Sequence, residues 1–180
     1  MRKILLHGCC ADCSLKFIES VKNDKEPAEI EIYYYNPNIH PRSEYQSRLK
    51  AMQEVIEKAG IRLIIPDWKP VDYFEVIDNS EKGIRCVNCW NLRIKKTAEY
   101  AKENGYDCFS TTLISSQYQD SNKVIEIGQL WAKKLGIEFV VPKYICTDLE
   151  TSGFYKQFFC GCVYSLRERL EEKYKLATKS

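Results

Sequence analysis

Cysteine is the residue type whose number and spacing in this sequence could do chemistry. Nine cysteines occur in 180 residues, and an odd number cannot all pair as disulfides. Disulfide frameworks are typical of small secreted chains, whereas only three apolar residues follow the two basic residues at the start of this chain. A secretory signal needs about 7–15. We therefore expect a cytoplasmic protein whose clustered cysteines are metal ligands or reactive thiols.

Three cysteines lie together where the first predicted strand meets the helix expected over 11–22. Cys9, Cys10 and Cys13 fall within five residues, and the positive end of a helix favours the thiolate that ligates metals. Such crowding suits a cluster, or a cluster beside a second metal. Asp12 either caps the helix or joins Cys13 at that second metal, and packing in the core is the alternative for Cys13.

Cys86 and Cys89 form a C-x-x-C motif, which we expect at the N-terminus of a second helix. This spacing lets two sulfurs converge on one centre, as in zinc and iron–sulfur sites. Together with Cys9 and Cys10 the motif makes a four-thiolate set. A structural zinc ion would take the same ligands, so both metals stay open at this point.

Cys160 and Cys162 are separated only by Gly161. A C-x-C disulfide strains the backbone, and glycine is the residue that permits it. Because a strained disulfide is easily reduced, we predict a redox-active pair, with two further metal ligands as the alternative. Cys108 and Cys146 are expected to pack rather than react.

Weaker candidates for substrate binding lie on the same predicted edge of the sheet. His40 is in a rigid loop after the second strand, and Tyr45 and Arg48 share a face of the next helix. Thr111 and Thr112 end the fourth strand, where Ser and Thr are often ordinary caps.

Alternating strands and helices should position these residues. Strands are predicted over 3–7, 29–35, 62–65, 106–113 and 138–141, and helices over 11–22, 43–59 (with Ser43 as N-cap), 71–78, 89–104, 121–135 and 163–175. This order predicts an α/β fold, namely a doubly wound, mainly parallel five-stranded sheet with a helical C-terminal segment, in one domain over 1–180. Ligands of such sheets bind at the carboxyl ends of the strands.

The composition is that of an ordinary globular protein. Hydrophobic residues make up 44% and charged residues 29%, with a net charge of +2. That charge neither requires nor excludes a nucleic-acid partner, because dedicated binders are more basic. No apolar run approaches the roughly 20 residues that span a bilayer, so we expect no membrane partner.

Five short motifs occur in order along the chain. They are His-Gly-Cys-Cys-Ala-Asp-Cys at 7–13, Tyr-Asn-Pro-Asn-Ile-His-Pro at 35–41 followed by Glu44, Tyr45 and Arg48, Arg-Cys-x-x-Cys at 85–89 followed by Arg93, Ser-Thr-Thr-Leu at 110–113, and Cys-Gly-Cys-Val-Tyr-Ser at 160–165. Together they resemble the cobalamin-independent epoxyqueuosine reductase family of the QueH type, over about residues 3–168. The resemblance implies an adenine-nucleotide-hydrolase-like (Rossmann-like) fold in which cysteines replace the phosphate loop.

The resemblance also implies a reaction and its site. Epoxyqueuosine at the wobble position of tRNA, in the anticodon stem-loop of GUN anticodons, would be reduced to queuosine with electrons from an external donor. It implies a [4Fe–4S] cluster on Cys9, Cys10, Cys86 and Cys89 and a redox-active Cys160–Cys162 pair. The candidates for substrate binding are His40, Tyr45, Arg48, Arg93, Thr111 and Thr112. Asp12 stands where the family usually has proline, so with Cys13 it is a candidate only for an additional mononuclear iron.

Two other functions compete with this interpretation. A zinc-bearing tRNA-binding module would use the same thiols without redox chemistry. A nucleotide-dependent tRNA thiolation enzyme of the same fold would need a Ser-Gly-Gly type of phosphate loop after the first strand, and this sequence lacks one.

Overall fold

The computed structural model describes residues 1–22, 28–77, 81–142 and 153–177. Within them, five strands form one all-parallel sheet in the order β3-β2-β1-β4-β5. The strands are β1 (Arg2–His7), β2 (Ala28–Tyr33), β3 (Arg62–Ile64), β4 (Cys108–Thr111) and β5 (Glu138–Phe139). The predicted α/β class and the parallel five-stranded sheet are therefore confirmed.

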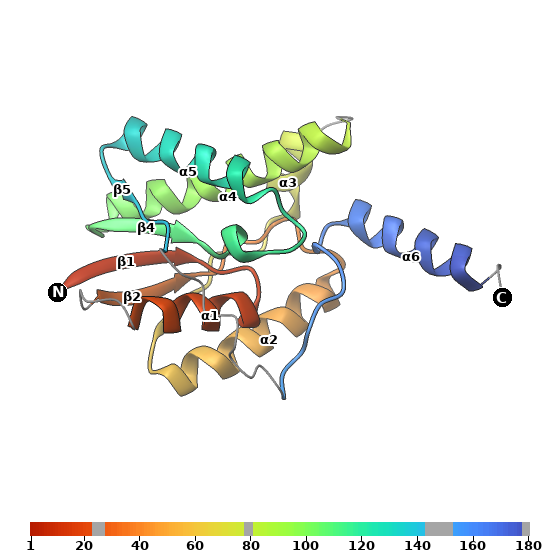
Figure 1. The fold of residues 1–180 in the computed structure, drawn as a ribbon, viewed down its shortest axis with the longest axis horizontal. Helices are drawn as coiled ribbons and strands as arrows, with labels where there is room; N and C mark the ends of the chain where they lie inside the picture. Colours follow the sequence, from red (N-terminus) through yellow and green to blue (C-terminus); the bar gives the residue numbers. More distant parts are fainter. Residues whose placement is uncertain (23–27, 78–80, 143–152, 178–180) are drawn as a thin grey trace.

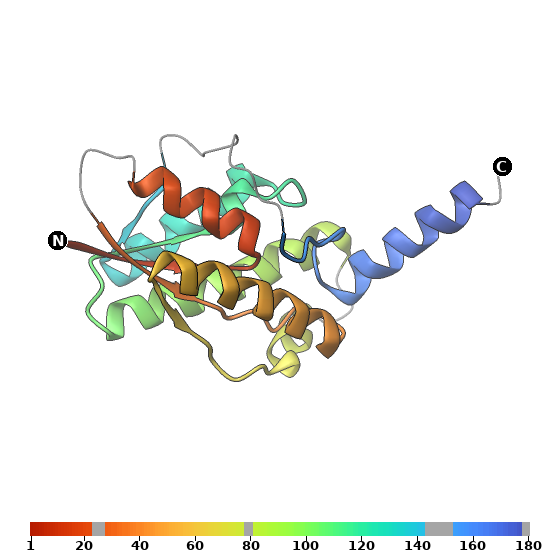
Figure 2. The same cartoon turned by 90° about the horizontal axis from the view of Figure 1, so that it is seen from below.

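Helices cover both faces of this sheet (Figure 1). The helices are α1 (Ala11–Lys22), α2 (Arg42–Ala59), α3 (Pro70–Ile77), α4 (Lys82–Glu103), α5 (Ser121–Leu135) and α6 (Val163–Ala177), with a short 3-10 helix η1 (Thr112–Ser115) after β4. Helices α1 and α2 lie on one face, and α4 and α5 on the other. Helix α6 extends away from the body, beyond the carboxyl ends of the strands (Figures 1 and 2).

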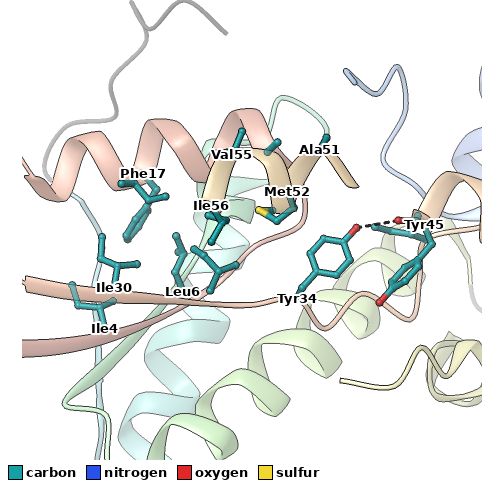
Figure 3. Packing of buried hydrophobic residues seen from close by; sticks show 14 of the residues in the cluster. Ile4, Leu6, Phe17, Ile30, Tyr34, Tyr45, Ala51, Met52, Val55 and Ile56 are labelled. Atoms are coloured by element: carbon teal, nitrogen blue, oxygen red, sulfur yellow. Dashed lines mark hydrogen bonds between the residues drawn. The ribbon is translucent and has the colours of Figure 1, made fainter. Parts of the chain in front are cut away.

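Strand β1 contributes to both halves of the core because successive side chains of a strand point to opposite faces. Ile4 and Leu6 pack with Phe17 of α1 and Met52 of α2 (Figure 3). Leu5 points to the other face and packs in the cluster that α4 and α5 cover. The near-continuous apolar run of β1 thus follows from burial on two sides.

The most important difference from the sequence prediction is the start of α4. This helix begins at Lys82 rather than 89, and the stretch 82–89 contains no proline that would prevent it from being helical. Cys86 and Cys89 therefore lie inside a helix, not at its N-terminus as predicted. Likewise α2 begins at Arg42 with Pro41 at the N-cap position, so Ser43 is not its cap.

The chain changes direction across the sheet beside β1. Strands β2 and β3 extend the sheet on one side of β1, and β4 and β5 extend it on the other. The β1–β4 boundary is thus the topological switch point, where ligands of doubly wound sheets bind. Register places His7 opposite Thr111 there. None of the helices in the described residues is long and apolar enough to cross a membrane.

Candidate functional site

A cavity of about 330 Å³ gathers four of the cysteines beyond this edge of the sheet. Cys86 and Cys89 come from α4, where residues three apart share a face of the helix. Cys160 and Cys162 come from the segment before α6. All eight cysteines within the described residues are free thiols. Cys146 lies outside the described residues, and Cys108 is buried in β4.

Six aromatic side chains line the cavity together with the cysteines. They are Tyr73, Trp90, Tyr118, Phe158, Phe159 and Tyr164. Arg85 stacks over Tyr164, with its guanidinium carbon 4.1 Å from the ring centroid. Gln119 accepts a hydrogen bond from the Trp90 indole and donates one to Cys160 Sγ at 3.3 Å. Flat aromatic walls with a few polar groups are suited to an unstacked nucleobase.

Cys162 lies at the N-terminus of α6. The Ser165 backbone N–H donates to Cys162 Sγ at 3.4 Å, and the Ser165 hydroxyl oxygen is also 3.4 Å from that sulfur. The pKa of Cys162 is lowered because Cys160 donates a hydrogen bond to it, and because Ser165 and Tyr73 also stabilise the thiolate. Cys160, which holds the shared proton and is buried, has a raised pKa. The two thiols are therefore chemically unequal.

The Cys160–Cys162 segment is tied to the sheet body through α2. Arg48 is only 2% exposed and donates to the carbonyls of Phe159 at 3.0 Å and Cys160 at 3.2 Å. Glu44 holds the same guanidinium, with Oε1 2.6 Å from Arg48 Nε. The His40 backbone N–H donates to the Gly161 carbonyl at 2.8 Å. Arg48 thus fixes the turn that carries both thiols.

The cysteines after β1 lie apart from the cavity wall. The Cys9 backbone N–H donates to Thr112 Oγ1 at 3.2 Å, and Cys9 Sγ is 3.4 Å from the same oxygen. The pKa of Cys9 is raised by its contact with Cys10 and by burial, and Cys13 and burial raise that of Cys10 to about 12. Contacts between neighbouring sulfurs and burial thus favour the protonated thiols in this turn.

Asp12 and Cys13 are the candidate ligands of a second metal, and both have other contacts in this structure. Asp12 Oδ2 is 2.9 Å from Lys16 Nζ, and Cys13 is buried. Among the described residues, no three His, Cys, Asp or Glu side chains converge closely enough to hold a single metal ion.

None of the six side chains proposed from the sequence for substrate binding lines the cavity. His40, Tyr45, Arg48, Arg93, Thr111 and Thr112 are all buried. His40 lies among Trp68, Tyr73 and Phe74, with ring centroids 5.0–6.2 Å away. Two of the six contact the backbone of the cavity cysteines: Arg48 donates to the Cys160 carbonyl and Arg93 to the Cys89 carbonyl.

Sequence reasoning missed the aromatic wall, Gln119 and Ser165. A signal was present, because aromatic residues directly adjoin the cysteines: Trp90 follows Cys89, Phe159 precedes Cys160. Aromatic residues are so common in cores that this adjacency alone does not separate a cavity wall from ordinary packing.

Comparison with known proteins gives the chain a family context. The model of the family described as Epoxyqueuosine reductase QueH matches residues 4–168. Similar curated proteins carry the same description. The one from Dehalococcoides mccartyi is 36% identical, covering 93% of this chain and 94% of its own length. The one from Histophilus somni is 36% identical, covering 92% of this chain and 73% of its own length. The one from Thermotoga maritima is 29% identical, covering 99% of this chain and 98% of its own length.

Proposed function

Because the chain belongs to the epoxyqueuosine reductase QueH family, and is therefore an oxidoreductase, we propose that it converts epoxyqueuosine to queuosine in the anticodon loop of tRNA in the cytoplasm. The observation that carries this proposal is the cavity in which four thiols meet six aromatic side chains. Redox-active groups and a surface for a base thus face the same space. The wall is proposed to stack on the modified base, as single-stranded RNA is commonly read.

The thiol pair supplies the two electrons that the reaction needs. Removing the epoxide oxygen to leave an alkene and water consumes two electrons and two protons. Closing Cys160 and Cys162, which share one proton, to a disulfide releases two electrons and that proton, so the second proton comes from solvent, and an external reductant must then reopen the disulfide. We propose that the proton shared by these thiols is delivered to the departing oxygen, with Ser165 and Tyr73 stabilising the sulfur that remains.

A [4Fe–4S] cluster on Cys9, Cys10, Cys86 and Cys89 is the proposed cofactor. When bound, it would transfer electrons one at a time from the external reductant, so that the Cys160–Cys162 disulfide can be reopened. Two observations support the fit. Thiolate sets are the usual ligands of such clusters, and Arg93, a buried cation, lies among these thiols with one Nη atom unpartnered in the described residues. We assign no second iron to Asp12, because its carboxylate pairs with Lys16.

The 3-2-1-4-5 strand order and the cysteines at the switch point support an adenine-nucleotide-hydrolase-like fold as part of this proposal. In that fold the turn after the first strand binds phosphate. Here Cys9 and Cys10 occupy the turn.

The test is anaerobic purification with analysis of iron, sulfide and zinc, followed by conversion of epoxyqueuosine-containing tRNA. The wild-type protein should contain iron and sulfide and form queuosine. Cys89→Ser should lose iron and turnover together, whereas Cys160→Ser and Cys162→Ser should retain iron and lose turnover. Cys108→Ala is the matched control, because its sulfur is buried in β4, and it should retain both.

Other outcomes separate the competing functions. Colourless protein that contains zinc and binds the tRNA without converting it would favour a zinc-bearing RNA-binding module. Loss of iron in Cys160→Ser would show that this thiol ligates the metal centre rather than acting as a redox partner. ATP-dependent sulfur transfer would indicate a thiolation enzyme.

A further inference from the structure

Arg93 is a buried cation whose role the proposed function leaves open. Its side chain is 1% exposed, and Nε donates to the Cys89 carbonyl at 3.3 Å. One terminal nitrogen, Nη2, has no hydrogen-bond partner among the described residues. No carboxylate of the described ranges forms an ion pair with it either. A buried, unpaired guanidinium is costly unless some negative charge compensates it.

The groups that interact electrostatically with Arg93 are thiols. Burial opposes the charge of Arg93, and the sulfurs of Cys89, Cys160 and Cys9 are the groups close enough to interact with that charge. These three sulfurs come from α4, from the segment before α6 and from the turn after β1. Arg93 is thus the place where the cysteine motifs, far apart in sequence, meet around one positive charge.

Arg93 interacts with the thiols from outside the cavity. Cys89 and Cys160 line the cavity, but Arg93 does not. A group with this placement does not touch a substrate in the cavity. It does lie against the sulfurs that would ligate the cluster, where the dielectric constant is low and a charge is weakly screened.

We propose that Arg93 is the buried countercation of the cluster and sets its reduction potential. This inference rests on the cluster of the proposed function. One-electron reduction adds one negative charge to the thiolate-bound centre, and no bond to Arg93 forms or breaks. A fixed positive charge stabilises the reduced state more than the oxidised state, and so raises the potential. Arg93 is therefore a positioning residue that acts through charge.

The experiment measures the midpoint potential of the anaerobically purified holoprotein by spectroscopic redox titration. Arg93→Gln should lower the potential, making the reduced cluster at least tenfold less favourable, which for one electron corresponds to about 59 mV. Arg93→Lys keeps the charge and should stay close to wild type. Arg62→Gln is the matched control, because its side chain is 69% exposed, and its potential should not change.

The outcomes separate this inference from the proposed function. If the wild-type protein contains no iron and sulfide, the proposed cluster is contradicted, and the inference about Arg93 with it. A wild-type cluster whose potential is the same in Arg93→Gln would overturn the countercation alone. If Arg93→Gln does not fold, the midpoint potential of Arg93→Lys tests the inference. A potential near that of the wild type supports an effect of charge. A potential lower by about 59 mV or more shows that the hydrogen-bond geometry of Arg93, and not its charge, sets the potential.

Discussion

At the scale of single residues, Thr111 shows how polar side chains at the strand ends support the site without reaching it. His7 Nε2 donates to the Tyr35 carbonyl at 3.1 Å, which leaves Nδ1 as the acceptor for the Thr111 hydroxyl at 2.9 Å. The same hydroxyl oxygen accepts from the Leu113 N–H at 3.2 Å. Thr111 therefore joins β1, β4 and η1 directly below the cysteine turn.

Replacing Thr111 with valine should destabilise the protein by about 1–3 kcal/mol, the usual cost of leaving buried polar groups unpaired. His7 and Leu113 would both lose a partner, with no change in side-chain size. Urea unfolding measures the effect. Thr97→Val is the matched control: Thr97 is equally buried but donates only to the Arg93 carbonyl within a helix. A similar loss in both variants would contradict this account.

At the scale of elements, the contact between α5 and the edge strand β5 depends on a glycine. A Cβ atom on Gly128 would overlap the ring of Phe139, so the helix packs closely on the strand only where no side chain intervenes. By contrast, a Cβ on Gly83 in α4 would meet no atom within 4 Å.

Gly128→Ala should therefore destabilise the protein by about 1–3 kcal/mol through overpacking. Gly83→Ala, at an exposed helical position, should instead stabilise it by roughly 0.5–1 kcal/mol, because alanine favours the helix. Denaturant midpoints of the two variants should move in opposite directions. A rise in both midpoints would show that helix propensity, rather than the contact with Phe139, controls the effect at Gly128.

Hydrophobic periodicity and capping residues predict the bounds of helices whose ends are marked in the sequence. Helices α1 and α5 match their predicted bounds, and Gly136 follows α5 in a left-handed conformation. The sequence prediction starts α4 seven residues too late, because it places the C-x-x-C motif at the N-terminus of the helix. The cavity could not be predicted, because it depends on where Cys89 and Cys160, 71 residues apart in sequence, meet in space.

At the scale of the whole molecule, the C-terminal segment is attached to the α/β body at a few well-defined points. Helix α6 itself extends outward (Figures 1 and 2). The attachment lies in residues 153–162, where Arg48 donates to two backbone carbonyls and Phe154 packs on the core cluster, and at the first turn of α6, where Tyr164 stacks with Arg85. The thiols Cys160 and Cys162 are held in the cavity by the same contacts.

Replacing Arg48 with methionine should loosen this attachment while leaving the sheet intact. Hydrogen bonds from a charged donor contribute about 1.5–3 kcal/mol each, and each 1.4 kcal/mol is about tenfold in an equilibrium. Amide hydrogen exchange over 153–162 should thus accelerate at least tenfold, whereas exchange in β1 stays unchanged. Arg62→Met is the control, because its exposed pair with Glu31 contributes only about 0–1 kcal/mol. Equal acceleration in β1 and in 153–162 would instead indicate global destabilisation, and the attachment would not depend on Arg48.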